Sequence, residues 1–218
     1  MSVLIKDYRA VVAIFFWLSI PEPTLRKVFL DAGFREVVAP LPPIPVIPGI
    51  QVTVTPPRKA IASYKSVKVS WDESKFMLSL EGVIDDLVEV LKAVKESFNM
   101  NGYPLEKVCH YYEVTFVTQP VDIDGFVVNL RKKFSVEIVV GDEKLKPFSI
   151  SFSNATEPIT KENFYRWMHI SINPDVNAPQ KRVFLQVIKR DVDFNRVVRF
   201  LEDIRSLIEQ LKKFFMSG

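Results

Sequence analysis

The most restrictive feature of this 218-residue chain is an internal repeat whose two copies lie 101 positions apart. The segment YKSVKVSWD, from Tyr64, aligns with YRWMHISIN, from Tyr165. The same offset aligns VAIFFWLSIPEP, from Val12, with EVTFVTQPVDID, from Glu113, and also the segments TLRKVFLDAGF and GFVVNLRKKFS behind them. Three matches in one order at one spacing indicate duplication, so the fold should be built from two related units.

Both halves follow the same order of predicted elements. A strand comes first, and a helix of about three turns follows it. Four short strands with alternating apolar residues come next, and the stretch 63–71 is predicted as one of them. A long helix with apolar residues at i, i+3, i+4 and i+7 closes each half. The predicted opening strand, short helix and long helix span 11–18, 24–32 and 84–99 in the first half, and 111–118, 124–133 and 194–215 in the second.

The sequence therefore predicts an α+β fold of two tandem β-α-β-β-β-β-α units that form one curved antiparallel sheet with the helices on one face. The units cover residues 1–101 and 102–218, and the junction NMNGYP is short, so they should pack together as one pseudo-symmetric body. The proline-rich stretch 39–49 should be an edge strand or a crossing loop, because proline cannot donate to a sheet ladder.

This order of elements resembles the TATA-binding-protein-like fold, in which two such units form a saddle from one continuous sheet. The resemblance covers most of the chain and concerns the architecture. The family's proline- and glycine-containing turn and the phenylalanine pairs that kink DNA are not found in this sequence. The same unit occurs in single-copy helix-grip proteins, which hold apolar ligands between sheet and helix. The resemblance thus implies a fold, and the function must be argued from sites.

Composition and charge indicate a globular protein without an obvious polyanion partner. Hydrophobic residues make up 48% of the chain, and the formal net charge of +3 is spread evenly over both halves. The single cysteine, Cys109, cannot form an intramolecular disulfide, which indicates a reducing cytoplasm. The longest apolar run, 10–18, is too short to cross a bilayer as a helix, so no membrane association is expected.

The sequence shows no recognisable catalytic motif. Its two histidines, His110 and His169, belong to different predicted strands, and the spacings HxH, CxxC and HExxH are absent. A glycine-rich phosphate loop and the GxSxG motif are absent too. We therefore expect no metal, no cofactor and no enzymatic activity.

The repeated strand offers the best candidate binding residues. Alternate side chains of a strand share a face, so one face should carry polar and aromatic residues while Val67, Val69, Met168 and Ile170 point to the core. Aromatic and basic groups on an open sheet can stack on bases and contact phosphates, or can form a protein interface, or can be hidden by dimerisation. The candidate binding residues are Tyr64, Lys68, Tyr165, Trp167 and His169.

The end of the last helix is a second candidate site. Aligned with the first long helix, it continues for about two more turns and carries Leu211, Phe214 and Phe215. The segment LKKFF resembles the core of peptides that bind sliding clamps, with Ile208 where that family has glutamine. These residues could dock on a partner, or they could pack on the body or on a second subunit.

The predicted function is a non-enzymatic binding protein that uses an exposed sheet face for nucleic acid or for a DNA-associated protein. One alternative is a carrier that holds an apolar small ligand between a long helix and the sheet. Another is a self-associating interaction module. A contiguous positive sheet face would favour nucleic acid, and a large apolar cavity would favour the carrier.

Overall fold

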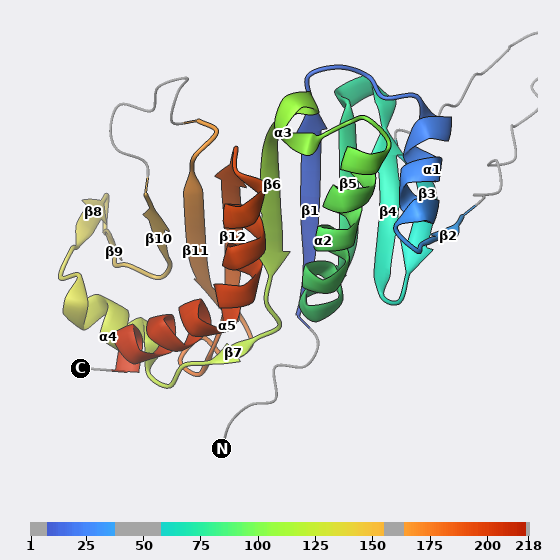
Figure 1. Ribbon diagram of the computed structural model, residues 1–218. Coiled ribbons are helices and arrows are strands. Elements are labelled where there is room, and N and C mark those ends of the chain that lie inside the picture. The colour runs from blue at the N-terminus through green and yellow to red at the C-terminus, as the bar shows by residue number, and fades with distance from the viewer. Residues whose placement is uncertain (1–7, 38–57, 155–163, 217–218) are drawn as a thin grey trace, which may run out of the picture.

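The computed structural model describes residues 8–37, 58–154 and 164–216. These residues form an α+β fold in which one large antiparallel sheet has helices packed on it, and Figure 1 shows α1, α2 and α5 on the same face. The predicted fold class is confirmed. The proline-rich stretch 39–49 lies outside the described residues, so the prediction of an edge strand or loop there stays a prediction.

The helices and strands follow the predicted order closely. The first half contains β1 (Arg9–Phe16), α1 (Glu22–Asp31), β2 (Arg35–Glu36), β3 (Lys59–Tyr64), β4 (Val67–Asp72), β5 (Met77–Val83) and α2 (Ile84–Met100). The second half contains α3 (Leu105–Val108), β6 (Cys109–Val117), β7 (Val121–Asp122), α4 (Phe126–Lys133), β8 (Ile138–Val140), β9 (Glu143–Leu145), β10 (Ile150–Ser153), β11 (Met168–Pro174), β12 (Arg182–Asp191) and α5 (Phe194–Met216).

The opening strands of the two halves, β1 and β6, lie side by side in the middle of the sheet. The strand order is β10-β11-β12-β6-β1-β5-β4-β3-β2, and β7 adds to β12. Each opening strand is therefore flanked by the last strand of its own half, β5 or β12. The antiparallel β1–β6 pair aligns Val12 with Val114 and Phe15 with Tyr111, so one hydrogen-bonded ladder joins the two halves.

Two strand predictions in the sheet are wrong. The stretch 63–71 is a hairpin of β3 and β4, because the chain turns at Lys65, which has a left-handed φ of 48°. The sequence also predicts one continuous sheet, but residues 138–140, in the segment VEIVV, pair with β9 in a separate two-stranded sheet. Periodicity finds strands, whereas it does not decide where a non-glycine residue reverses the chain or which strand a segment pairs with.

The core lies between the sheet and the long helices. Alternate residues of the central strands are buried, among them Val12, Ile14 and Val114. The inner stripes of α2 and α5 meet them in a single hydrophobic cluster, which includes Leu91 and Leu201. The helical side of the sheet is thus filled by side chains from both halves. The other face carries none of the long helices among the described residues, and we call it the open face.

The C-terminal end of α5 packs on the body of the second half. Phe215 is fully buried, its ring centroid lies 4.9 Å from that of Phe126, and its carbonyl oxygen accepts a 2.9 Å hydrogen bond from Asn129. Leu211 is partly buried against the core, while Phe214 is 40% exposed. Of the three residues considered for docking, Phe215 is core, which favours the packing alternative over the clamp-binding peptide.

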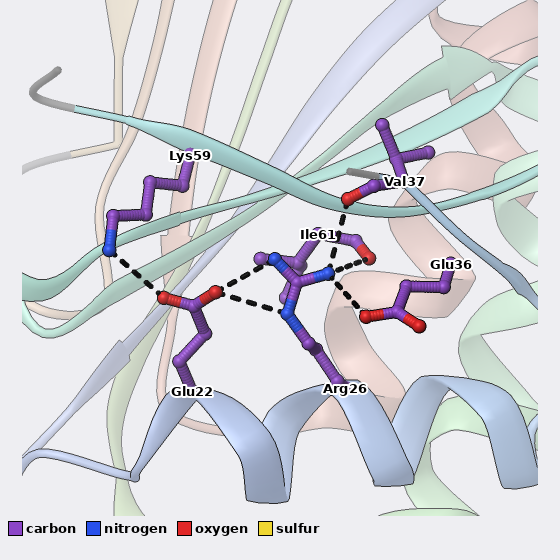
Figure 2. Close-up of polar contacts among 6 residues, drawn as sticks. All are labelled: Glu22, Arg26, Glu36, Val37, Lys59 and Ile61. Carbon is purple, nitrogen blue, oxygen red and sulfur yellow. Dashed lines mark hydrogen bonds and ion pairs between the residues drawn. The ribbon is translucent and has the colours of Figure 1, made fainter. Parts of the chain in front are cut away.

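A polar network fixes α1 to the edge of the sheet formed by β2 and β3 (Figure 2). The Arg26 guanidinium donates to Glu22 Oε1 at 2.7 Å, to Glu36 Oε1 at 2.9 Å and to the carbonyls of Val37 and Ile61. Lys59 Nζ lies 3.1 Å from Glu22 Oε2. The hydrogen bonds from Arg26, and then those from Lys59, lower the pKa of Glu22 although its partial burial opposes this.

Replacing Phe215 by Ala should destabilise the protein by about 3–5 kcal/mol, because it empties a fully buried site. Replacing Phe214 by Ala should cost less than about 1 kcal/mol, because that ring is partly exposed. Urea unfolding followed by circular dichroism measures both. Equal losses of unfolding free energy in the two variants would contradict the burial of Phe215 at the end of α5.

The Glu22→Gln variant should be less stable than the parent at neutral pH and nearly equal to it in acid. The folded state lowers the pKa of Glu22, so its contribution is present above the usual value of 4.5 and is lost as the pH falls through the lowered value. Urea unfolding at about pH 7 and about pH 3 measures this difference, which we expect to be about 1 kcal/mol at most. A difference that is the same at both pH values would contradict the ion-pair account.

Candidate functional site

The open face presents the strand residues that alternate with the core. Direct neighbours in an antiparallel pair point to the same side, so the register assigns each residue to a face. Phe15 of β1 is paired with Tyr111 of β6, and His169 of β11 is paired with Ile188 of β12, and all four point away from the helices.

Most of the predicted binding residues lie on this face, but Tyr64 does not. Lys68 is exposed and is paired with Ser63 on one side and Glu81 on the other. Tyr64 is paired with the core residue Val67, and its hydroxyl points to Glu89 of α2 at 3.4 Å. The prediction that Tyr64 shares a face with Lys68 is wrong, because the turn at residue 65 interrupts the alternation.

Aromatic side chains gather at one end of the open face. The rings of Phe15 and Tyr111 are stacked with centroids 4.4 Å apart and an interplanar angle of 12°. Trp17, which follows β1, stacks on His110 at 3.6 Å, and Tyr165 contacts both His110, at 4.3 Å, and Tyr111, at 5.2 Å. Three segments far apart in the sequence thus form one continuous set of ring contacts.

Arg190 of β12 connects these rings to the rings of Phe164 and Trp167. Its guanidinium carbon lies 4.5 Å from the ring centroid of Phe164 and 5.3 Å from that of Trp167, within cation–π range. Its Nε donates to Glu113 of β6 at 2.7 Å, and both side chains are about four-fifths covered. We call the whole set the open-face aromatic cluster: Phe15, Trp17, His110, Tyr111, Phe164, Tyr165, Trp167, His169 and Arg190.

Of the sequence-predicted residues, the structure brings together Tyr165, Trp167 and His169. Lys68 lies on the same face, but β4 is five strand positions from β11, which corresponds to roughly 24 Å. The predicted set is therefore split between the aromatic cluster and a separate basic position.

Sequence reasoning missed most of the cluster. Trp17 and Arg190 do not belong to the repeated strand on which the prediction was based, and His110 was considered only as a sheet-face histidine. The signal that could have found them is the strand order. Once β1, β6 and β12 are neighbours, alternation places their aromatic and basic residues at one end of one face.

The charges of the open face are mostly paired. Arg9 lies 3.4 Å from Glu81, and Arg190 lies 2.7 Å from Glu113. Lys68 has no hydrogen bond or ion pair with any residue that the structure describes. The face is thus not a contiguous positive surface.

The reactive groups nearby do not assemble a recognisable catalytic site. Burial raises the pKa of the Cys109 thiol to about 12, which disfavours the nucleophilic thiolate. His169 Nε2 lies 2.8 Å from Ser171 Oγ, but within the described ranges no hydrogen bond orients the other ring nitrogen, as a serine–histidine pair would need. In residues 8–37, 58–154 and 164–216, no group of three or more His, Cys, Asp and Glu side chains could hold a metal ion.

One groove on the helical side lies between the two long helices. It has a volume of about 270 Å³, and its lining includes Tyr8, Val83, Val88, Leu201 and Arg205. Most of its lining residues belong to α2 and α5 rather than to the sheet. It therefore does not match the helix-grip arrangement, in which a ligand lies beneath a long helix.

Comparisons with known proteins do not assign the chain to a group. No model of a protein family matches the chain, and a search of curated proteins finds no match either. Among the described helices, none is long and apolar enough to span a membrane.

The Trp17→Ala variant should raise the pKa of His110. Burial holds the pKa of His110 below its usual 6.5, and Trp17 covers one side of the imidazole. Removing the indole lets water solvate the imidazolium, so the pKa should move toward 6.5. An NMR titration of the imidazole protons measures this, with Lys68→Ala as the control variant. An unchanged His110 titration in Trp17→Ala would contradict the stacked geometry.

Proposed function

We propose that this chain is a non-enzymatic binding protein and that a protein partner docks on the open-face aromatic cluster. The observation that carries the proposal is the set of eight aromatic and imidazole rings around Arg190, on the sheet face opposite the long helices. Trp17 is 62% exposed and Phe164 is 43% exposed, so part of this apolar surface is available for contact.

The residue types in the cluster suit a protein interface. Tyrosine, tryptophan and arginine supply most of the binding energy in such interfaces, where they form a central patch with a polar rim. Here ring–ring contacts hold most of the side chains in place, and Glu113 orients the Arg190 guanidinium. Binding would therefore lose little side-chain entropy, which favours affinity.

The charge distribution favours protein over nucleic acid as the partner. When lysine and arginine side chains bind a phosphate backbone, they release the counterions of the nucleic acid. This contribution to the binding free energy grows with the number of cations that are free to contact phosphates. On the open face, Arg9 and Arg190 are already neutralised by Glu81 and Glu113. Lys68 could contact a phosphate, but it is remote from the rings on which bases would stack.

The two alternatives receive less support. The side chains that the long helices turn toward the sheet, such as Leu87, Leu91 and Ile204, are fully buried in the core. An apolar ligand between helix and sheet would therefore have to displace packed side chains. An enzyme would need a nucleophile or base with an orienting partner, and the Ser171–His169 pair lacks one in the part of the chain that the structure describes. The single cysteine supports a cytoplasmic setting for the binding function.

Selection of a displayed random-peptide library on the immobilised protein tests the proposal. Binding of a selected peptide should weaken at least about fivefold in Trp17→Ala and in Phe164→Ala, since truncating a central interface aromatic costs more than about 1 kcal/mol. Both rings are partly exposed, so their removal should not unfold the protein. The matched control Lys68→Ala should bind as tightly as the parent. If no selected peptide depends on Trp17 or Phe164, the assignment of this surface is wrong.

Fluorescence anisotropy with labelled single- and double-stranded DNA completes the test. We expect no binding at physiological salt. Tight binding that weakens steeply with salt, and that is lost in Trp167→Ala and Lys68→Ala, would overturn the protein partner in favour of nucleic acid.

A further inference from the structure

The hairpin of β8 and β9 exposes an unusual number of large apolar side chains. It forms a two-stranded sheet of its own, and every residue of its strands is exposed. We call these side chains and their apolar neighbours the hairpin surface: Phe134, Val136, Ile138, Val139, Val140, Leu145 and Phe148, which are between 36% and 61% exposed.

Packing among the residues that the structure describes leaves this surface exposed in a single copy. Successive strand residues point to opposite faces, so the run Ile138, Val139 and Val140 makes both faces of β8 apolar. A hairpin that covers a core on one side and meets water on the other would alternate apolar and polar residues. Contiguous exposed apolar residues of this kind mark interaction sites.

The charges around the hairpin differ between its tip and its base. At the tip, Asp142 of the turn and Glu143, the first residue of β9, have no ion pair with any described residue. At the base lies the last turn of α4 with Arg131 and Lys132, and Arg131 Nε donates to the carbonyl of Pro147 at 3.2 Å. Glu137, also at the base, is paired with Lys144 and Lys146, so the charges without an ion pair among the described residues are acidic at the tip and basic at the base.

The end of the large sheet that is formed by β10 also favours association. The terminal strand β10 has the sequence ISFS, with no charge and no proline. The strand at the opposite end, β2, has only two residues, Arg35 and Glu36, and both are charged. Short and charged edge strands resist pairing, whereas neutral ones permit it. The end nearer the hairpin in the chain is thus the less protected one.

We propose that the hairpin surface binds a second copy of this chain across a two-fold axis, with the two hairpins antiparallel. This arrangement buries one face of each hairpin, that of Ile138, Val140 and Leu145, against the same face of the other. It also places the acidic tip of each hairpin, Asp142 and Glu143, beside the basic base of the other, Arg131 and Lys132. A surface whose two ends carry opposite charge is complementary to itself in this orientation, which is the requirement of an isologous dimer.

Sedimentation velocity over a range of concentrations tests the dimer. The parent protein should associate to a dimer, and Ile138→Asp should be monomeric at the same concentrations, because the carboxylate would be buried on the interface face opposite Leu145, without a cationic partner in its own hairpin. Val117→Asp is the matched control: Val117 is also an exposed apolar strand residue, but it lies on the open face of β6. It should dimerise like the parent.

A charge-reversal pair gives a second, independent readout. Glu143→Lys and Lys132→Glu should each weaken dimerisation by about tenfold, and the double variant should recover most of the affinity. Circular dichroism should show both single variants folded, because both side chains are exposed. A monomeric parent protein, a dimer that survives Ile138→Asp, or the absence of recovery in the double variant would each overturn the proposal.

Discussion

The pairing of β1 with β6 is the constraint on which the rest of the structure depends. These two strands come from different halves of the chain, and one antiparallel register fixes both faces of the sheet at its centre. It aligns Val12 with Val114 beneath the long helices and stacks Phe15 on Tyr111 on the open face. A slip of one residue would exchange the faces and lose the core and the aromatic cluster together, which explains why the two are inseparable.

Around this pair the halves share an order of strands but differ in chemistry. In the first half the open face carries small or charged residues such as Ser70, Ser79 and Lys68. The rings gathered around Arg190 come mostly from the second half, and the first half adds Phe15 and Trp17 at the β1–β6 pair. The long helices differ as well, because α5 continues far enough for Phe215 to pack on α4. The outer strands of the first half thus supply mainly structure, while the contact surface spans the line where the two halves meet.

The sequence predicts what local periodicity controls and fails where long-range pairing decides. The bounds of α2 and α5 follow from their apolar stripes, and the structure extends each by one residue at the C-terminal end. The hairpin at Lys65 was missed because no glycine signals its left-handed turn. The aromatic cluster was found only in part, since Trp17, His110 and Tyr165 meet only after the strand order is known.

The two proposed surfaces share no residue. The aromatic cluster reaches the terminal strand β10, where Trp167 Nε1 donates to Ser153 Oγ at 3.0 Å, whereas the hairpin forms a separate two-stranded sheet. The hairpin surface is tied to α4 through Arg131, whereas the aromatic cluster lies on the open face. A dimer formed through the hairpins would therefore keep two aromatic clusters available. A partner with two matching sites would bind such a dimer more tightly than a single copy, because the first contact raises the effective concentration of the second.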